Sequence, residues 1–347
     1  MKFQASTLAA FVAIPAVSAT LGWPWISPPN GIGHGGKNSD NDLLHTLAVK
    51  AGKKYFGTAT DNGELNNKDY TKILNNNKQF GQLTPSNGQK WMYIEPEQNV
   101  FNFTNGEVVG NLAKKNHQIL RCHTLVWHSQ LPEWVEFGNW TKETLSAVVV
   151  NHITKVLTQW KGKPSTTAVT VGEIVFNTGI GEDYLGLAFK TAAKIDPSTK
   201  LYINDYNLEA RSDKTRAVQK LVRSLKKQKV KIDGVGAQAH LIVGSTPSRE
   251  AQIQNLQDFV ATGVEVAQTE LDIRLALPAN ATNLAQQSID YENTVAACGA
   301  WVPSVFAGEG AATLYFEDFT KHPAYWGVVK ALASGGKHPH WPWPFNN

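Results

Sequence analysis

Hydrophobic and polar positions follow two different periods along most of the chain. Seven short runs are rich in β-branched, aromatic and other apolar residues, which is typical of strands. Between them, apolar positions recur every three to four residues, as in helices that bury one face. The predicted strands begin near residues 54, 80, 118, 166, 200, 233 and 264, and the clearest predicted helices span 142–160, 182–195, 214–230, 249–262 and 323–334.

This alternation of strands and helices predicts a parallel sheet. The apolar runs are too continuous for a sheet with one solvent-exposed face, which favours strands buried on both sides. We therefore predict an α/β fold, a (β/α)8 TIM barrel over residues 43–334. The alternative, an open doubly wound sheet, normally carries a glycine-rich phosphate turn after its first strand, and TATDNGEL at that position is not such a turn.

The N-terminus has the layout of a secretory signal. Lys2 precedes an apolar run over 8–17, and small residues end at Ala19, so we expect cleavage after residue 19 and a secreted, extracellular protein. Residues 20–42, rich in Pro, Gly and Asn, are predicted to be a propeptide or irregular lead-in, and 335–347 an aromatic C-terminal tail. The N-x-S/T sequons that predict glycosylation are Asn102, Asn139 and Asn280.

Composition and net charge indicate which classes of binding partner to expect. The formal net charge of the 347 residues is only +4 and no cluster of like charges stands out, so we expect neither nucleic acid nor a membrane as a partner. The only two cysteines, Cys122 and Cys298, cannot build a disulfide framework, and no metal-ligand spacing occurs. We expect a monomer without cofactor or metal. Eleven tryptophans suit a protein that stacks the flat apolar faces of sugar rings.

Polar and aromatic side chains gather where the predicted strands end. In a barrel these positions converge on one mouth, and amides, imidazoles and tryptophans around carboxylates suit a polyhydroxylated ring, so we predict a carbohydrate pocket. Individually, His123 and His128 could be a metal pair, Glu270 an ion-pair partner of Arg274, and Trp127 plain core. The residues at the predicted mouth are Asn87, Lys90, Trp91, His123, Trp127, His128, Gln130, 204–207, Gln238, His240, Glu270 and Asp272.

Several segments resemble family 10 of the glycoside hydrolases, the secreted endo-1,4-β-xylanases. KYFGTATDN, FGQLTPSNGQKW, HTLVWHSQLPEWV, KLYINDYNLEA, GVGAQAHL and VEVAQTELDIR occur in family order and at family spacing. The resemblance implies a barrel that hydrolyses xylan with retention of configuration, with Glu270 as nucleophile and His240 hydrogen-bonded to it. It further implies glycone-side contacts from Asn87, Lys90, His123, Trp127 and Gln130, residues around the catalytic pair at Asn204, Tyr206 and Gln238, and a cleft tryptophan at Trp301.

The second carboxylate that a retaining enzyme needs is ambiguous in this sequence. The family has Trp-Asp-Val-Val-Asn-Glu at the end of strand four, where this chain has TTAVTVGEIVFNTGIGEDY. In one alignment Glu173 is the acid/base and the following loop is shortened. In the other, strand four and its glutamate are replaced and Glu173 is there by accident.

A second departure from the family follows Cys298. The chain runs ACGAWVPSVF directly, so the eighth strand is expected to be missing or incomplete, and with it the usual partner of Cys298, so we expect no disulfide with Cys122. Ser86 and Gln89 also differ from common family residues on the glycone side. Three hypotheses stay open: a xylanase, a tomatinase-like relative acting on a plant saponin, and a catalytically impaired sugar-binding relic.

Overall fold

The fold is seen in a computed structural model that describes residues 43–162, 165–170, 175–276, 279–299, 314–315 and 319–334, with backbone only for 165–170. All of these belong to one unit spanning 36–347. The predicted signal, lead-in and C-terminal tail lie outside the described residues, as does the segment 300–313 where the eighth strand is expected to be missing or incomplete.

Seven parallel strands form the main sheet and pair in chain order, with β6 followed by β8. All seven predicted strands are therefore confirmed. Two short strands that were not predicted, β7 and β9, pair in parallel beyond the ends of β6 and β8. The strands are β1 Gly57–Thr60, β2 Gln82–Pro85, β3 Ile119–Cys122, β4 Ser165–Thr170, β5 Lys200–Asp205, β6 Gly234–Ala237, β7 His240–Ile242, β8 Glu265–Gln268 and β9 Asp272–Arg274.

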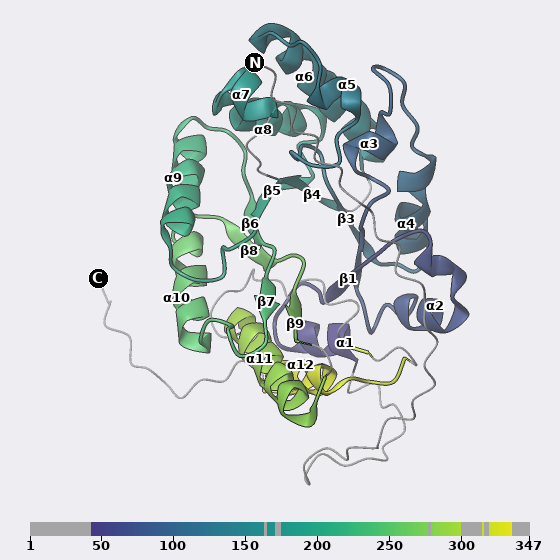
Figure 1. Cartoon of the computed structure of the whole chain (residues 1–347), viewed down its shortest axis with the longest axis vertical. Coiled ribbons are helices and arrows are strands. Elements are labelled where there is room, and N and C mark those ends of the chain that lie inside the picture. Colours follow the sequence, from purple (N-terminus) through teal and green to yellow (C-terminus); the bar gives the residue numbers. More distant parts are fainter. Residues whose placement is uncertain are drawn as a thin grey trace, which may run out of the picture. The chain divides into compact units, whose positions relative to one another are not determined.

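Helices connect successive strands and lie outside them (Figure 1), as parallel pairing requires. The five predicted helices are confirmed within a few residues as α6, α8, α9, α10 and α12. The bounds are α1 Leu44–Lys50, η2 Glu64–Asn66, α2 Lys68–Leu74, α3 Trp91–Ile94, α4 Thr104–Lys115, α5 Glu133–Glu136, α6 Lys142–Trp160, α7 Val175–Ile180, α8 Asp183–Ile195, α9 Asp213–Lys227, α10 Arg249–Val260, α11 Ala281–Gly299 and α12 Pro323–Ala333.

The 19-residue helix α11 was not predicted, because the face that it buries is partly polar. Gln287 and Asp290 are each 3% exposed. Gln287 donates to the carbonyl of Ile273 at 2.6 Å, and Asp290 accepts from the N–H of Gly244 at 2.7 Å. These bonds satisfy the buried polar groups and attach α11 to β9 and to the segment after β7. A pattern of apolar positions cannot detect such a face.

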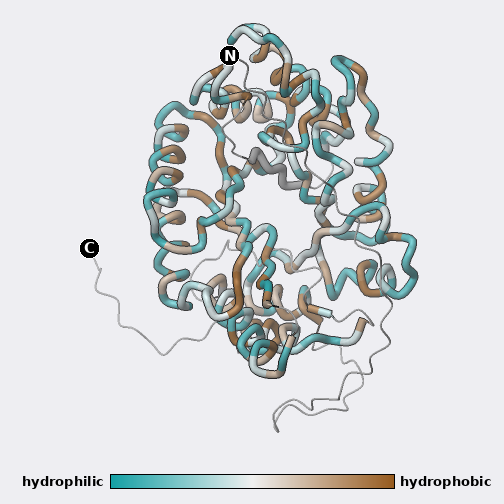
Figure 2. Tube along the Cα trace, viewed as in Figure 1, coloured by the Kyte–Doolittle hydropathy of each residue, from teal (hydrophilic) through white to brown (hydrophobic). Residues whose placement is uncertain are grey.

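The helices bury apolar stripes against the sheet. In α8 the stripe includes Leu185, Ala188, Phe189 and Ala192, at the three-to-four-residue spacing of one helical face. Figure 2 shows brown and teal residues alternating along the outer helices in the same way. No helix of the described part of the chain is long and apolar enough to cross a bilayer.

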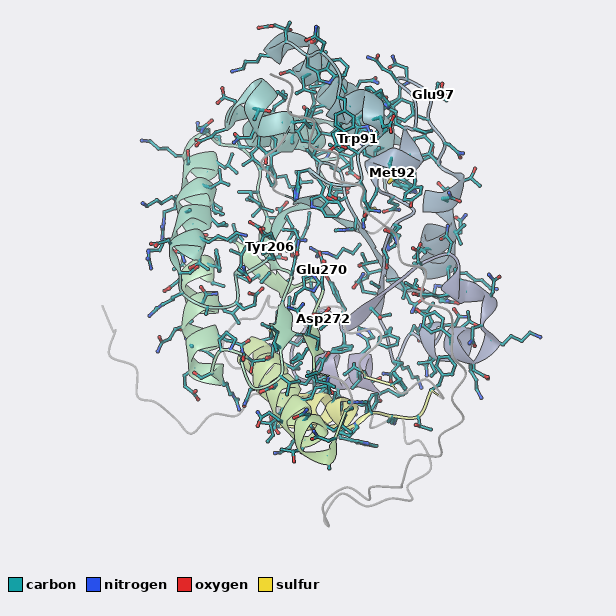
Figure 3. All side chains as sticks on the ribbon, viewed as in Figure 1. Trp91, Met92, Glu97, Tyr206, Glu270 and Asp272 are labelled. Carbon is teal, nitrogen blue, oxygen red and sulfur yellow. The ribbon has the colours of Figure 1, made fainter. Side chains whose placement is uncertain are left out.

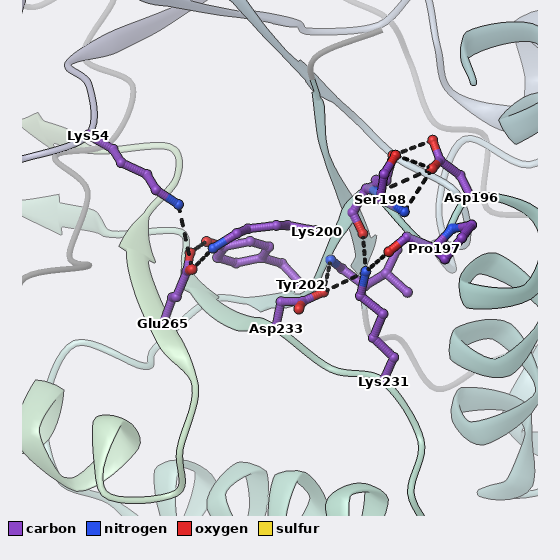
Figure 4. A network of polar contacts seen from close by, with 11 residues as sticks. Lys54, Asp196, Pro197, Ser198, Lys200, Tyr202, Lys231, Asp233 and Glu265 are labelled. Carbon is purple, nitrogen blue, oxygen red and sulfur yellow. Dashed lines mark hydrogen bonds and ion pairs between the residues drawn. The ribbon is translucent and has the colours of Figure 1, made fainter. Parts of the chain in front are cut away.

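The amino ends of the strands carry a charged network (Figure 4). Glu265, the first residue of β8, accepts a hydrogen bond from the Tyr202 hydroxyl at 2.6 Å and pairs with Lys200. It also pairs with Lys54 at 3.5 Å, just before β1. The network therefore links β5 and β8 to the residues just before β1. It thus joins β1 and β8, the first and last of the seven strands.

Helix α9, which connects β5 to β6, provides a test of this scaffold. Ser212 caps it: its hydroxyl accepts from the N–H of Thr215 at 3.1 Å, and the Thr215 hydroxyl accepts from the N–H of Ser212 at 2.8 Å. We expect Ser212→Ala to lower the free energy of unfolding by about 1 kcal/mol, measured by urea denaturation. The same change at exposed Ser224, inside α9, should stay within about 0.5 kcal/mol of the parent. Equal effects at both positions would contradict the capping role.

Candidate active site

Strand register brings the predicted residues of three strands to one edge of the sheet. Asp205 pairs with Ala237, and Ala237 pairs with Gln268, at the carboxyl ends of β5, β6 and β8. The pairing continues just beyond these strand ends. The N–H of Gln238 donates to the carbonyl of Asp205 at 2.9 Å, and the N–H of Glu270 donates to the carbonyl of Gln238 at 3.0 Å. Asn204, Gln238 and Glu270 are thus neighbours in space.

The Glu270 carboxylate is held on both oxygens. Oε1 accepts from Asn204 Nδ2 at 2.8 Å, and Oε2 lies 3.2 Å from His240 Nε2. The Thr269 hydroxyl donates to Asn204 Oδ1 at 2.5 Å, which turns the amide so that its N–H faces Glu270. A Cβ on Gly236 would come within 2.3 Å of Asn204 Oδ1, so glycine is required beneath this arrangement.

His240 lies between two carboxylates. Its Nδ1 is 3.1 Å from Asp272 Oδ1, opposite the Glu270 contact, and the register of β7 and β9 pairs His240 with Asp272. Figure 3 shows Glu270 and Asp272 where β8 passes into β9. A quarter of the Glu270 side chain and 39% of the His240 side chain are exposed, so the pair is reachable from solvent.

Three groups in the mouth have shifted pKa values. Burial raises the pKa of Glu270, but the hydrogen bond to His240, the charge that His123 carries below its own pKa of about 4, and the bond from Asn204 outweigh it and bring the pKa of Glu270 to about 2. The Asp272 and Glu270 carboxylates raise the pKa of His240 to about 10. Burial lowers the pKa of His123 to about 4. At neutral pH the mouth therefore holds an ionised Glu270, a protonated His240 and a neutral His123.

A second polar cluster comes from the ends of β1 and β2 and the segment after β3. Asn87 Nδ2 donates to Asp61, while Asn87 Oδ1 accepts from Lys90 Nζ at 3.0 Å and from Gln130 Nε2 at 3.2 Å. Lys90 Nζ also donates to Gln130 Oε1 and lies 4.8 Å from the centre of the Trp127 ring. The structure thus brings together four of the predicted residues and adds Asp61.

His123 and Gln89 connect this cluster to the core. The ring centres of His123 and Trp127 are 6.4 Å apart. Gln89 is 2% exposed; its Oε1 accepts from the N–H of His123 at 3.2 Å and its Nε2 donates to the carbonyl of Gly106 at 3.3 Å. Gln89 therefore supports the backbone of β3's end and presents no group to the mouth.

Tyr206 follows β5 and is half exposed. Lys214 Nζ lies 3.6 Å from the centre of its ring and 2.9 Å from Asp205 Oδ1. The ammonium group fixes one face of the ring by a cation–π contact. An exposed aromatic ring at the mouth of a barrel is a suitable platform for a sugar.

Two predicted site residues, Glu173 and Trp301, lie outside the described residues. Asp61 and Thr269 were absent from the predicted site residues, although each stands next to a strand end and could have been found from that position alone. Asp272 was predicted at the mouth, but its contact with His240 was not. Cys122 and Cys298 are both buried and are not joined to each other by a disulfide.

Comparisons with known proteins agree with this geometry. The family model described as glycosyl hydrolase family 10 matches residues 44–331. An endo-1,4-beta-xylanase A of Humicola insolens is 48% identical, over 86% of this chain and 88% of that protein. An endo-1,4-beta-xylanase of Agaricus bisporus is 45% identical, over 82% of this chain and 93% of that protein.

A solved structure shares the fold. A family 10 xylanase from Bispora sp. MEY-1, solved with xylobiose, superposes with a TM-score of 0.79 at 36% identity, over 83% of this chain and 99% of that one. The family and its solved relatives give this chain a (β/α)8 barrel fold, as predicted, and seven of its parallel strands lie among the described residues. The chain belongs to glycosyl hydrolase family 10.

Proposed function

We propose that this glycoside hydrolase is a secreted endo-1,4-β-xylanase that cleaves internal bonds of plant xylan with retention of configuration. The observation that carries the proposal is the Glu270 carboxylate, kept ionised by His240 and Asn204 at the mouth of a family 10 barrel. The names of its relatives and the xylobiose in the Bispora structure support xylan as the substrate class.

In the proposed mechanism, Glu270 attacks the anomeric carbon while the glycosidic bond to the leaving sugar breaks. Glu173 donates a proton to the leaving oxygen, then takes a proton from the water that attacks the glycosyl-enzyme ester and releases Glu270 as a carboxylate. The placement of β4 supports this role for Glu173, because Thr170 pairs with Asn204 and Glu173 follows three residues later in the sequence. His240 orients the attacking oxygen.

The remaining predicted residues are proposed to bind the sugar chain. Asn87, Lys90 and Gln130 supply polar contacts on the glycone side, with His123 and Trp127 beside them. Around the catalytic pair we propose Asn204, Tyr206 and Gln238, and we propose that Trp301 lines the sugar cleft.

We also propose extracellular localisation with a signal at 1–19, a lead-in at 20–42, a catalytic barrel at 43–334, an aromatic tail at 335–347, and action as a monomer. Asn139 and Asn280 are exposed and suit N-glycosylation. At Asn102, Oδ1 accepts from the N–H of Thr104 at 3.0 Å, which leaves the amide nitrogen for a glycan.

The main test of function is the product pattern. We expect the purified protein to release xylobiose and longer oligosaccharides from xylan, with the β-anomer formed first by NMR, because double displacement retains configuration. Glu270→Gln should lower kcat by a factor on the order of 10³ or more while keeping xylooligosaccharide binding by calorimetry. Release of an intact oligosaccharide from a saponin, with no xylan cleavage, supports the tomatinase-like alternative. Binding without turnover supports the relic.

The role of Glu173 has its own test. We expect Glu173→Gln to lower kcat/KM on xylan by about 10²- to 10⁴-fold, because the sugar leaving group needs a proton. An aryl xylobioside with an acidic phenol leaving group should form the glycosyl-enzyme at a nearly normal rate in a stopped-flow burst. The matched control is Glu182→Gln, an exposed glutamate nearby in the sequence. Full activity of Glu173→Gln on xylan assigns the acid to another residue.

The pairing of His240 predicts its titration. NMR of labelled imidazoles should give a His240 pKa of about 10, far above the ordinary value of about 6.5, and Asp272→Asn should lower it. Because the folded-state pKa exceeds the unfolded one, this pair stabilises the fold fully below about pH 6.5, and the contribution is lost as the pH rises through about 10. His123, titrating near 4, is the internal contrast. A His240 pKa near 6.5 is incompatible with the paired geometry.

A further inference from the structure

The turn that presents His240 contains a left-handed alanine. Ala239, between β6 and β7, has a φ of +63°. A residue with a Cβ disfavours this conformation, and it persists where surrounding contacts hold it. The next residue is His240, so the conformation of Ala239 sets the direction in which the imidazole leaves the backbone.

Both backbone polar groups of Ala239 are held. Its N–H donates to Glu209 Oε1 at 2.8 Å, and its carbonyl accepts from the N–H of Asp272 at 3.2 Å. Ala239 is fully buried, so no water can replace a lost partner without opening the turn.

Glu209 is itself anchored. It lies in the turn after β5 and is 8% exposed. The preceding residue, Leu208, accepts on its carbonyl from Asn255 Nδ2 at 2.7 Å, and Asn255 is fully buried on α10. Burial raises the pKa of Glu209. A carboxyl group placed in such a position at the expense of its hydration indicates a specific role for its oxygen.

We propose that Glu209 is a positioning residue: its carboxyl oxygen holds Ala239 in the left-handed conformation and thereby directs His240 between Glu270 and Asp272. The effect on catalysis rests on the proposed function, because it acts through His240 and Glu270. The effect on the direction of the imidazole does not depend on the proposed function.

Hydrogen bonding and charge make different predictions here. The carboxylates in contact with His240 are Glu270 and Asp272. Glu209 interacts with the charge of His240 without contacting it, and it is linked to His240 by its hydrogen bond to the backbone of Ala239. If Glu209 acted through charge, its amide analogue would fail. If it acts by accepting a hydrogen bond, Glu209→Gln retains the function, because the amide oxygen accepts from the same N–H.

The experiment compares Glu209→Met, which keeps volume but removes the acceptor, with Glu209→Gln in the full chain. We expect Glu209→Met to lower the NMR-measured pKa of His240 and to reduce kcat on an aryl xylobioside about 10- to 100-fold, with KM changed less than about threefold. Glu209→Gln should restore both values. An unchanged His240 titration in Glu209→Met, or a Glu209→Gln protein as impaired as Glu209→Met, overturns the proposal.

The matched control is Asp196→Asn. Asp196 is 2% exposed and its carboxylate accepts from the N–H groups of Ser198 and Thr199 at 3.0 and 3.2 Å, before the opposite end of β5. We expect this variant to lose stability but to keep the His240 titration and kcat. A His240 shift in Asp196→Asn equal to that in Glu209→Met makes the effect general and contradicts the proposal.

A further variant covers the case in which Glu209→Met does not fold. Adding Ala239→Gly allows the positive φ without steric cost. The double variant is expected to fold and to show a His240 pKa below that of the wild type, because the backbone is no longer held. A wild-type pKa in the double variant overturns the proposal. Absence of xylan cleavage by the wild-type protein contradicts the proposed function and leaves the titration test intact.

Discussion

The whole site depends on keeping one carboxylate ionised where only a quarter of its side chain reaches solvent. Burial alone raises the pKa of Glu270, so the hydrogen bonds and charges of its neighbours must lower the pKa by more than burial raises it. Asn204 and His240 do so directly, at 2.8 and 3.2 Å. Each of these is oriented in turn, Asn204 by the Thr269 hydroxyl and His240 by Asp272. The ionisation of one group is therefore a property of several strands and their register.

The amino ends of the strands carry contacts that join the sheet, whereas the carboxyl ends carry the candidate active site. At the amino ends, Glu265 accepts from Tyr202 and pairs with Lys54 and Lys200, which joins the first and last of the seven strands. At the carboxyl ends, charged groups lie opposite hydrogen-bond donors and remain partly open to solvent. This division fits parallel strands, because all their loops of one kind emerge on one side. Because the strands are parallel, the stabilising contacts and the candidate active site lie at opposite ends of the sheet.

Sequence patterns predicted the seven strands and most of the mouth, because an apolar run shows where a strand ends and Glu270, Asn204 and Gln238 follow such ends. Helix α11 was missed because Gln287 and Asp290 occupy its buried face. Contacts between distant segments were also beyond prediction. Nothing near Glu209 in the sequence indicates that it meets Ala239, and an alanine gives no sign of a positive φ, unlike glycine.

The orientation of the Asn87 amide follows from the donors and acceptors around it. Both acceptor sites of Asn87 Oδ1 are used, by Lys90 and Gln130, and its Nδ2 faces Asp61. Lys90 keeps N–H groups for a ligand, while Asp61 and Gln130 Oε1 keep unused acceptor sites. A sugar hydroxyl bound there can therefore accept from Lys90 and donate to one of these oxygens. The Asn87 amide itself cannot turn over, because its nitrogen would then face the Lys90 ammonium group and its oxygen the Asp61 carboxylate.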